Sequence, residues 1–252
     1  MAVVSRFAPD EAVEWVARIT ALPGDDFEWL ALVEGVTVHE TYFFRDPAQL
    51  NLLRRELLPG LLRDRAGNGK RRISVWSAGC ASGEEPYSVA ILVLDTLTEL
   101  GESPRDWSID VLGTDISRQM VNVARDGVYG APGLDSFRQM PPEHLTYFVS
   151  DLTIGPRSKR VSPVLKSLVR FQQHNLMDDH APGGDFDVVF CRNVMIYFED
   201  DPQAHTQDLL RDALATGGYL LLGVTDRIAD PVSFERCQFS NTVIYRKKRC
   251  EG

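Results

Sequence analysis

The sequence lacks two kinds of targeting segment. No apolar run in the 252-residue chain approaches the roughly 18 residues that a membrane-spanning helix needs. Residues 1–10 contain no basic stretch followed by an apolar one, so no signal peptide is visible. We therefore expect a cytoplasmic protein that inserts no part of itself into a membrane.

Cysteine is scarce, and its spacing excludes two further classes of protein. The four cysteines, Cys80, Cys191, Cys237 and Cys250, are far apart and form no C-x-x-C pair. This spacing argues against a zinc site and against a disulfide framework, so we expect free thiols and no bound metal. Basic residues are also few, because 27 Lys and Arg stand against 36 Asp and Glu. The net charge of −9 argues against nucleic acid as a partner.

The composition that is present, 44% hydrophobic and 25% charged residues, fits one large globular domain. Predicted strands and helices alternate through most of it. We expect helices over 11–35 (broken at 22–25), 47–62, 85–100, 116–125 and 202–214, and strands over 73–75, 107–115, 186–191, 219–224, near 234 and over 243–245. The alternation predicts an α/β fold with a mostly parallel sheet covered on both faces, and the last two strands predict an antiparallel end. Between 148 and 173 the alternation fails, and extended pieces at 154–161 and 167–172 predict a small β insertion.

A glycine turn between the first strand and its helix is the strongest functional signal. Gly79 and Gly83 permit a tight turn that brings backbone amides and a helix N-terminus to a ligand. The G-x-G-x-x-G spacing is absent, and Glu84 and Glu85 follow at once. Paired carboxylates would repel a pyrophosphate but suit an ammonium group. The turn therefore disfavours NAD and favours S-adenosylmethionine, which has an ammonium group and no phosphate.

Asp115 ends the second predicted strand. A carboxylate there could accept hydrogen bonds from both hydroxyls of a ribose. The alternative is that Asp115 caps the helix that begins near Ile116, which is a common use of Asp. With the glycine turn upstream, we prefer the ribose interpretation.

Four ordered motifs carry a family resemblance: ETYFFRD at 40–46, WSAGCASGEEPYS at 76–88, GTDI at 113–116 and FCRNVMIYF at 190–198. Together they resemble the CheR chemotaxis methyltransferases, over about residues 38–246. The resemblance implies a Rossmann-like class I methyltransferase fold. It also implies transfer of a methyl group from S-adenosylmethionine to glutamate side chains of a methyl-accepting chemoreceptor, with S-adenosylhomocysteine as product.

The resemblance assigns roles to individual residues. Arg192 and Tyr197 correspond to the family's catalytic pair close to the transferred methyl group. The glutamate that meets the methionine ammonium group corresponds to Glu84, and Glu85 has no assigned role. The residues implied in cofactor binding are Thr41, Arg45, Ala78, Gly79, Glu84, Asp115, Asn175, Leu176, Arg192 and Asn193.

Other interpretations of these side chains stay open at this point. Arg45 could pair with Asp46 or another acid, and Tyr197 could be an interface aromatic. We expect Phe43, Phe44 and Phe198 to form core or pocket wall.

The resemblance also implies a division of the chain. We expect an N-terminal helical region with the first cofactor motif at 1–66, and the methyltransferase domain at 67–252 with a β-subdomain at about 149–173. In some family members that subdomain binds a receptor's C-terminal peptide. The helical region before Thr41 is shorter than the family's usual N-terminal domain, and His39 stands where the motif usually has Asn. The alternative function is therefore a cofactor-binding regulatory module of a longer chemosensory protein, with little activity alone.

Overall fold

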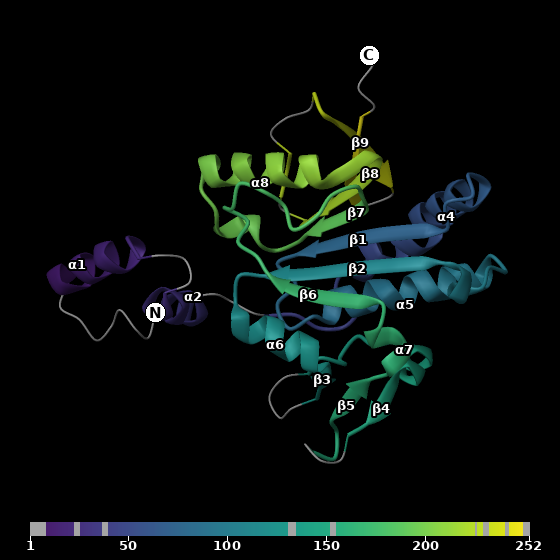
Figure 1. Cartoon of the computed structure of the whole chain (residues 1–252), viewed down its shortest axis with the longest axis horizontal. Coiled ribbons are helices and arrows are strands. Elements are labelled where there is room, and N and C mark those ends of the chain that lie inside the picture. Colours follow the sequence, from purple (N-terminus) through teal and green to yellow (C-terminus); the bar gives the residue numbers. More distant parts are fainter. Residues whose placement is uncertain are drawn as a thin grey trace.

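A seven-stranded sheet forms the centre of the protein (Figure 1). The computed structural model describes residues 9–22, 26–36, 40–130, 135–151, 155–224, 226–228, 232–239 and 242–248. The strand order is β6-β2-β1-β7-β8-β10-β9, parallel from β6 to β8 and antiparallel for β10 and β9. The strands are β1 Arg72–Ala78, β2 Ser108–Asp115, β6 Val169–Gln173, β7 Phe186–Cys191, β8 Leu214–Leu222, β9 Phe234–Phe239 and β10 Thr242–Lys247. The predicted mixed sheet with an antiparallel end is confirmed.

The central strands are apolar on both faces because helices cover both sides of the sheet. On β7, Val188 and Phe190 belong to one hydrophobic cluster, whereas Val189 and Cys191 belong to the other. The first cluster contains α5 (Glu84–Glu99), and the second contains the inner side of α8 (Asp200–Ala213). The period-2 alternation of a strand thus places successive side chains in different cores.

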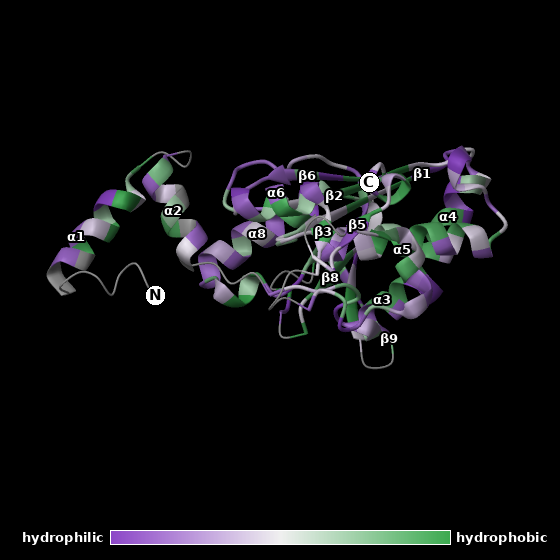
Figure 2. Ribbon diagram, turned by 90° about the horizontal axis from the view of Figure 1, so that it is seen from below, coloured by the Kyte–Doolittle hydropathy of each residue, from purple (hydrophilic) through white to green (hydrophobic). Residues whose placement is uncertain are grey.

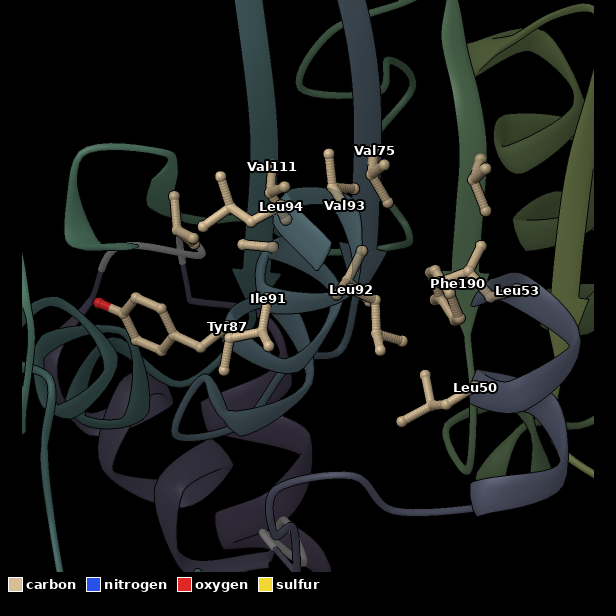
Figure 3. Close-up of a cluster of buried hydrophobic side chains, with 14 of the residues drawn as sticks. Leu50, Leu53, Val75, Tyr87, Ile91, Leu92, Val93, Leu94, Val111 and Phe190 are labelled. Atoms are coloured by element: carbon tan, nitrogen blue, oxygen red, sulfur yellow. The ribbon is translucent and has the colours of Figure 1, made fainter. Parts of the chain in front are cut away.

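Figure 3 shows the first core, in which α5 and the preceding helical segment both pack against the sheet. Ile91 and Leu92 of α5 lie in the same buried cluster as Val75 of β1 and Val111 of β2. Leu53, also fully buried there, comes from the helical segment before the sheet. Residues before the first strand therefore share the core of the large sheet.

That helical segment is widened in its middle. It consists of α3 (Pro47–Leu52), one π-helical turn (Leu53–Leu57) and α4 (Leu58–Gly67), so the predicted helix at 47–62 is present and extends further. The N–H of Leu58 donates to the carbonyl of Leu53, five residues back. Pro59 follows at once and has no N–H to continue an i→i−4 ladder, which accounts for the widened turn at this position.

A second, three-stranded antiparallel sheet has the order β3-β5-β4. Its strands are β3 (Val128–Tyr129), β4 (Phe148–Ser150) and β5 (Lys159–Val161). The small β-subdomain is confirmed, but its extent differs from the predicted 149–173. It begins before that range, and β6 pairs in parallel with β2, so it belongs to the large sheet. Because β6 is an edge strand with an exposed Arg170 between buried neighbours, its alternation in the sequence resembles that of a hairpin strand.

Several short helices connect these elements. α6 (Arg118–Asp126) follows β2, and Ser117 is its N-cap, accepting a hydrogen bond from the N–H of Met120. α7 (Pro163–Lys166) leads into β6. Short 3-10 helices lie at Pro104–Asp106, Pro142–Tyr147 and Met195–Tyr197.

Two N-terminal helices, α1 (Pro9–Thr20) and α2 (Phe27–Val36), confirm the predicted helical region and its break. Figures 1 and 2 both place them beyond the end of the sheet toward which β1, β2 and β6 run. In Figure 2, α1 carries purple and green segments in turn, and Val13 on it is 71% exposed. Among the helices of the described residues, none has the length and apolar character needed to cross a membrane.

Candidate functional site

The glycine turn after β1 requires its glycines. Gly79 has a φ of 78°, and a Cβ atom there would lie 2.3 Å from Cγ2 of Val194. Gly83, the N-cap of α5, has a φ of 93°, and its added Cβ would lie 2.7 Å from that of Ala124. Since both positions combine a left-handed backbone with a close neighbour, no other residue fits without rearrangement.

The turn is tied to the end of β2. The N–H groups of Gly79 and Cys80 both donate to the carbonyl of Thr114 at 2.8 Å. The N–H of Ala81 donates to Oδ2 of Asp115, also at 2.8 Å. The predicted ligand-facing turn and the predicted ribose acid are thus brought into direct contact.

A cavity of about 430 Å³ opens beside this contact. That volume lies within the usual range of small-molecule sites. Its walls come from the carboxyl ends of the parallel strands and from the N-terminal region, where α/β folds bind their ligands. The lining residues are Trp29, Glu40, Thr41, Arg45, Gly79, Cys80, Ala81, Glu85, Asp115, Ile116, His174, Asn175, Leu176, Met177, Arg192, Asn193, Val194, Tyr197 and Phe198.

Asp115 is 8% exposed and lines the cavity. Its Oδ1 accepts from the N–H of Ser117 at 2.9 Å, while the side chain of Ser117 itself caps α6. The helix cap that was the alternative role for Asp115 is therefore made by Ser117.

The two glutamates after the turn have different surroundings. Glu84 is 2% exposed and accepts hydrogen bonds from Oγ of Ser82 and Ser136, at 2.7 and 2.9 Å. Burial raises the pKa of its carboxyl group above the ordinary value. Glu84 does not line the cavity, whereas Glu85 does, so the predicted assignment of the ligand-facing role to Glu84 disagrees with the structure. Adjacent helical residues differ by about 100° in direction, which places only one of the two at the cavity.

Arg192 is held by the groups around it. Its Nε donates to Oε2 of Glu85 at 2.5 Å. Its Nη1 donates to Oδ2 of Asp46 at 3.0 Å, to the carbonyl of Arg45 at 3.1 Å and to Oε1 of Gln49 at 3.4 Å. The guanidinium group thus joins the first cofactor motif to the glycine-turn helix, with a side chain that is 3% exposed.

Gln49 and Ser77 support this network from behind. Nε2 of Gln49 donates to the carbonyl of Leu222 at 2.7 Å, and Oγ of Ser77 donates to Oε1 of Glu85 at 2.7 Å. Such second partners fix the rotamers of the groups that face a ligand.

The remaining predicted site residues divide into two groups. Thr41, Arg45, Asn175, Leu176, Asn193 and Tyr197 all line the cavity, and Tyr197 stands at its edge with 63% exposure. Ala78 instead lies in a hydrophobic cluster and does not line it. The Arg45–Asp46 pair, which was the alternative interpretation of Arg45, is not found, because Asp46 pairs with Arg192 and the Arg45 guanidinium donates to the carbonyl of Glu40.

The predicted core or wall aromatics are confirmed. Phe43 packs among three other aromatic rings, Phe44 stacks on His144 at 4.7 Å between ring centroids, and Phe198 lines the cavity. His39 lies outside the described residues.

The thiols are not reactive groups of this site. Cys80, Cys191 and Cys237 are free, and Cys250 lies outside the described residues. Burial raises the pKa of Cys80, which lines the cavity, well above its ordinary value, so the thiol stays protonated at neutral pH. In the part of the chain that the structure describes, no three or more His, Cys, Asp or Glu side chains gather as metal ligands would.

Trp29, His174 and Met177 line the cavity but carried no signal in the sequence. Ile116 and Val194 also line it, and they stand inside recognised motifs in which they had no assigned role. Asp46, which pairs with Arg192, stands inside a recognised motif. The motif alone does not tell that the Asp46 side chain points toward Arg192.

A parallel α/β sheet with this turn, an acid at the end of β2 and a cavity rich in carboxylates defines an S-adenosylmethionine-dependent methyltransferase. The model of the family described as "CheR methyltransferase, SAM binding domain" matches residues 39–243. The chain belongs to this family.

Curated relatives agree with this assignment. Chemotaxis protein methyltransferase 1 of Pseudomonas aeruginosa is 35% identical over 238 residues, which cover 93% of this chain and 82% of the relative. The chemotaxis protein methyltransferase of Vibrio parahaemolyticus is 37% identical over 221 residues, covering 87% and 76%. Chemotaxis protein methyltransferase Cher2 of Pseudomonas putida is 32% identical over 236 residues, covering 93% and 82%. The chain is therefore an S-adenosylmethionine-dependent chemotaxis protein methyltransferase.

Proposed function

We propose that the cavity binds S-adenosylmethionine and presents its methyl group to glutamate side chains of a chemoreceptor. The charges of the lining support this fit. Three carboxylates, from Glu40, Glu85 and Asp115, accompany two guanidinium groups, from Arg45 and Arg192. Carboxylates suit a ligand with an ammonium group and a sulfonium, and they would repel a phosphate. Because Glu40 pairs with Arg138 at 2.8 Å, Glu85 and Asp115 carry this argument.

Each part of the cofactor has a matching group. Glu85 holds the ammonium group, and Asp115, whose position beside the turn carries the proposal, accepts from the ribose hydroxyls. Arg45 pairs with the methionine carboxylate. Thr41, Gly79, Asn175 and Asn193 supply further polar contacts, and Ile116, Leu176 and Met177 supply an apolar surface for the adenine.

The acceptor needs little chemical help from the protein. When bound, S-adenosylmethionine supplies a methyl group on a positively charged sulfur. A glutamate carboxylate, with a reference pKa of about 4.3, is already ionised at neutral pH, so no general base is required. The residues of this chain have to exclude water and align the acceptor.

Arg192 and Tyr197 face the acceptor. Nε and Nη1 of Arg192 are engaged by the acids and by the first motif, which fixes the plane of the guanidinium group. Its remaining donors orient the incoming carboxylate, and the exposed ring of Tyr197 forms the rim against which the acceptor side chain lies.

The partner is a methyl-accepting chemoreceptor, and the site of action is the cytoplasm. The small sheet is a candidate site for a receptor's C-terminal peptide, which would pair with an edge strand. Arg157 and Lys159 are its available cations, since Arg160 pairs with Asp151 at 2.6 Å.

The test is methyl transfer from labelled S-adenosylmethionine to the cytoplasmic domain of a chemoreceptor. We expect a base-labile label on the receptor, as a glutamate methyl ester gives, and its loss with the Asp115→Ala variant. An unlabelled receptor in the presence of a chain that binds S-adenosylhomocysteine would refute the proposal.

A further inference from the structure

Helix α2 contributes Trp29 to the lining of the cavity. Its residue Trp29 is half-buried and lines the cavity with Asp115 and Ile116. Phe27, two residues earlier on the same helix, is 83% exposed. The two aromatic side chains of α2 thus differ, because Trp29 lies at the cavity and Phe27 lies in solvent. The helix precedes the region at 39–243 that the family model matches.

A carboxylate anchors α2 at the start of α6. Glu34 accepts from the N–H of Gln119 at 3.0 Å and from Oγ of Ser117. That same Oγ accepts from the N–H of Met120. The hydroxyl of Ser117 and two backbone N–H groups of the first turn of α6 therefore all have acceptors. A helix N-terminus stabilises a nearby negative charge, so the carboxylate of Glu34 is favourably placed at the start of α6.

The anchor is connected to the proposed ribose acid. Ser117 donates from its hydroxyl to Glu34 and from its backbone N–H to Oδ1 of Asp115. One residue therefore links α2 to the acid that borders the glycine turn. The bonds of Glu34 therefore hold α2 against the segment that directly follows Asp115 and Ile116.

We propose that Trp29 is a cofactor-contacting residue on the adenosine side of the cavity, and that Glu34 is its positioning residue. An indole ring gives a flat apolar surface for an adenine or ribose, and the bonds of Glu34 hold that surface at the cavity. The inference rests on the proposed function, because it needs the cavity to bind S-adenosylmethionine.

Tryptophan fluorescence tests the contact directly in the full chain. S-adenosylhomocysteine is titrated into the wild type and into the Trp29→Phe and Trp15→Phe variants. Trp15 lies on the neighbouring helix α1 and does not line the cavity, so it is the matched control. We expect the ligand-induced change in emission to persist in Trp15→Phe and to be largely lost in Trp29→Phe.

Calorimetry tests the energetic contribution and the anchor. Trp29→Ala should weaken binding of S-adenosylhomocysteine about tenfold, the size expected for one aromatic–base contact. The same substitution should weaken binding of 5′-methylthioadenosine by the same factor, because that ligand keeps the adenosine part. Glu34→Ala should weaken binding of both ligands. The control is Glu28→Ala, which removes a charge from the same helix at its ion pair with Arg18 and should leave both affinities unchanged.

Hydrogen exchange on the wild type gives a readout that needs no substitution. We expect the ligand to slow exchange of the amides of α2. The inference is overturned, and the proposed function stands, if the wild type binds S-adenosylhomocysteine but three results are negative. These are an emission change that persists in Trp29→Phe, affinities that the Trp29 and Glu34 substitutions leave unchanged, and exchange of the α2 amides that the ligand does not slow. If the wild type binds no S-adenosylhomocysteine, both are overturned.

Discussion

At the scale of residues, Asp115 is the most informative side chain to change. Its carboxylate receives backbone bonds from the turn and from the residue before α6, and it lines the cavity. Hydrogen bonds to charged groups contribute about 1.5–3 kcal/mol, so Asp115→Ala should weaken S-adenosylhomocysteine binding by about one to two orders of magnitude. Calorimetry measures this. Asp110→Ala is the control, because Asp110 lies on the same strand and pairs with Arg170 at 2.8 Å.

Arg192 should affect transfer more than binding. Arg192→Lys keeps the positive charge beside Glu85 and Asp46 but loses the rigid fork that contacts both. We expect kcat for receptor methylation to fall by about 10- to 100-fold, as misalignment of an acceptor does, with the affinity for S-adenosylhomocysteine changing much less. Arg160→Lys, at the ion pair with Asp151, serves as control. Equal losses in binding and in kcat would contradict this role.

Glu84 provides a prediction for the dependence of stability on pH. Burial raises the pKa of this carboxyl group in the folded chain above its ordinary value of 4.5. The folded state therefore holds the proton to higher pH than the unfolded state does. The resulting stabilisation is complete below the unfolded pKa and is lost as the pH rises through the folded pKa. Denaturant unfolding at several pH values should show this loss in the wild type and not in Glu84→Gln.

The sequence motif identified the paired glutamates but not which of them faces the ligand. Glu84 and Glu85 are the same amino acid at adjacent positions. Which of them faces the cavity depends on the rotation of α5 about its axis, and packing of the whole helix sets that rotation. Only the fold turns Glu84 toward Ser82 and Ser136 and Glu85 toward Arg192.

At the scale of elements, the glycine turn has a measurable steric requirement. Gly79 and Gly101 have similar φ angles, 78° and 74°, but an added Cβ meets Val194 at the first and nothing within 4 Å at the second. Gly101→Ala should cost about 1–2 kcal/mol of unfolding free energy from the backbone alone. Gly79→Ala should cost about 1–3 kcal/mol more, from the clash. Equal costs in chemical denaturation would show that Val194 moves freely.

Most elements could be predicted because their apolar periodicity is strong. β7 and α5 are apolar runs of the length expected for a buried strand and a buried helix, and both appear within a residue or two of their predicted bounds. β6 was placed in the wrong sheet because pairing with β2 is a long-range contact that five residues do not encode. The division at residue 66 likewise assigns α3 and α4 to the N-terminal region, although their leucines are buried in the core with α5.

At the scale of the whole molecule, ligand binding should stabilise one cooperative unit. α3, α4, α5 and the first strands share a core, so we expect them to unfold together. S-adenosylhomocysteine at 100 times its Kd should raise the unfolding free energy by about 2.7 kcal/mol. Thermal denaturation checks this. A second transition that the ligand leaves unmoved would show that part of this core folds separately.

The contact between α2 and α6 also belongs to this scale. Glu34 and Ser117 are 83 residues apart, and nothing in either local sequence announces the pair. The sequence therefore predicted the cofactor and the strand-end acid, but not that Trp29 of α2 lines the same cavity as that acid.

A crystal structure of the chain with S-adenosylhomocysteine would show how the cofactor lies in the cavity. We expect ligand density beside Gly79, with the ammonium group on the carboxylate of Glu85 and the ribose hydroxyls on Asp115. Ligand density elsewhere, or an ammonium group bound by Glu84 with Glu85 turned away, would contradict this expectation.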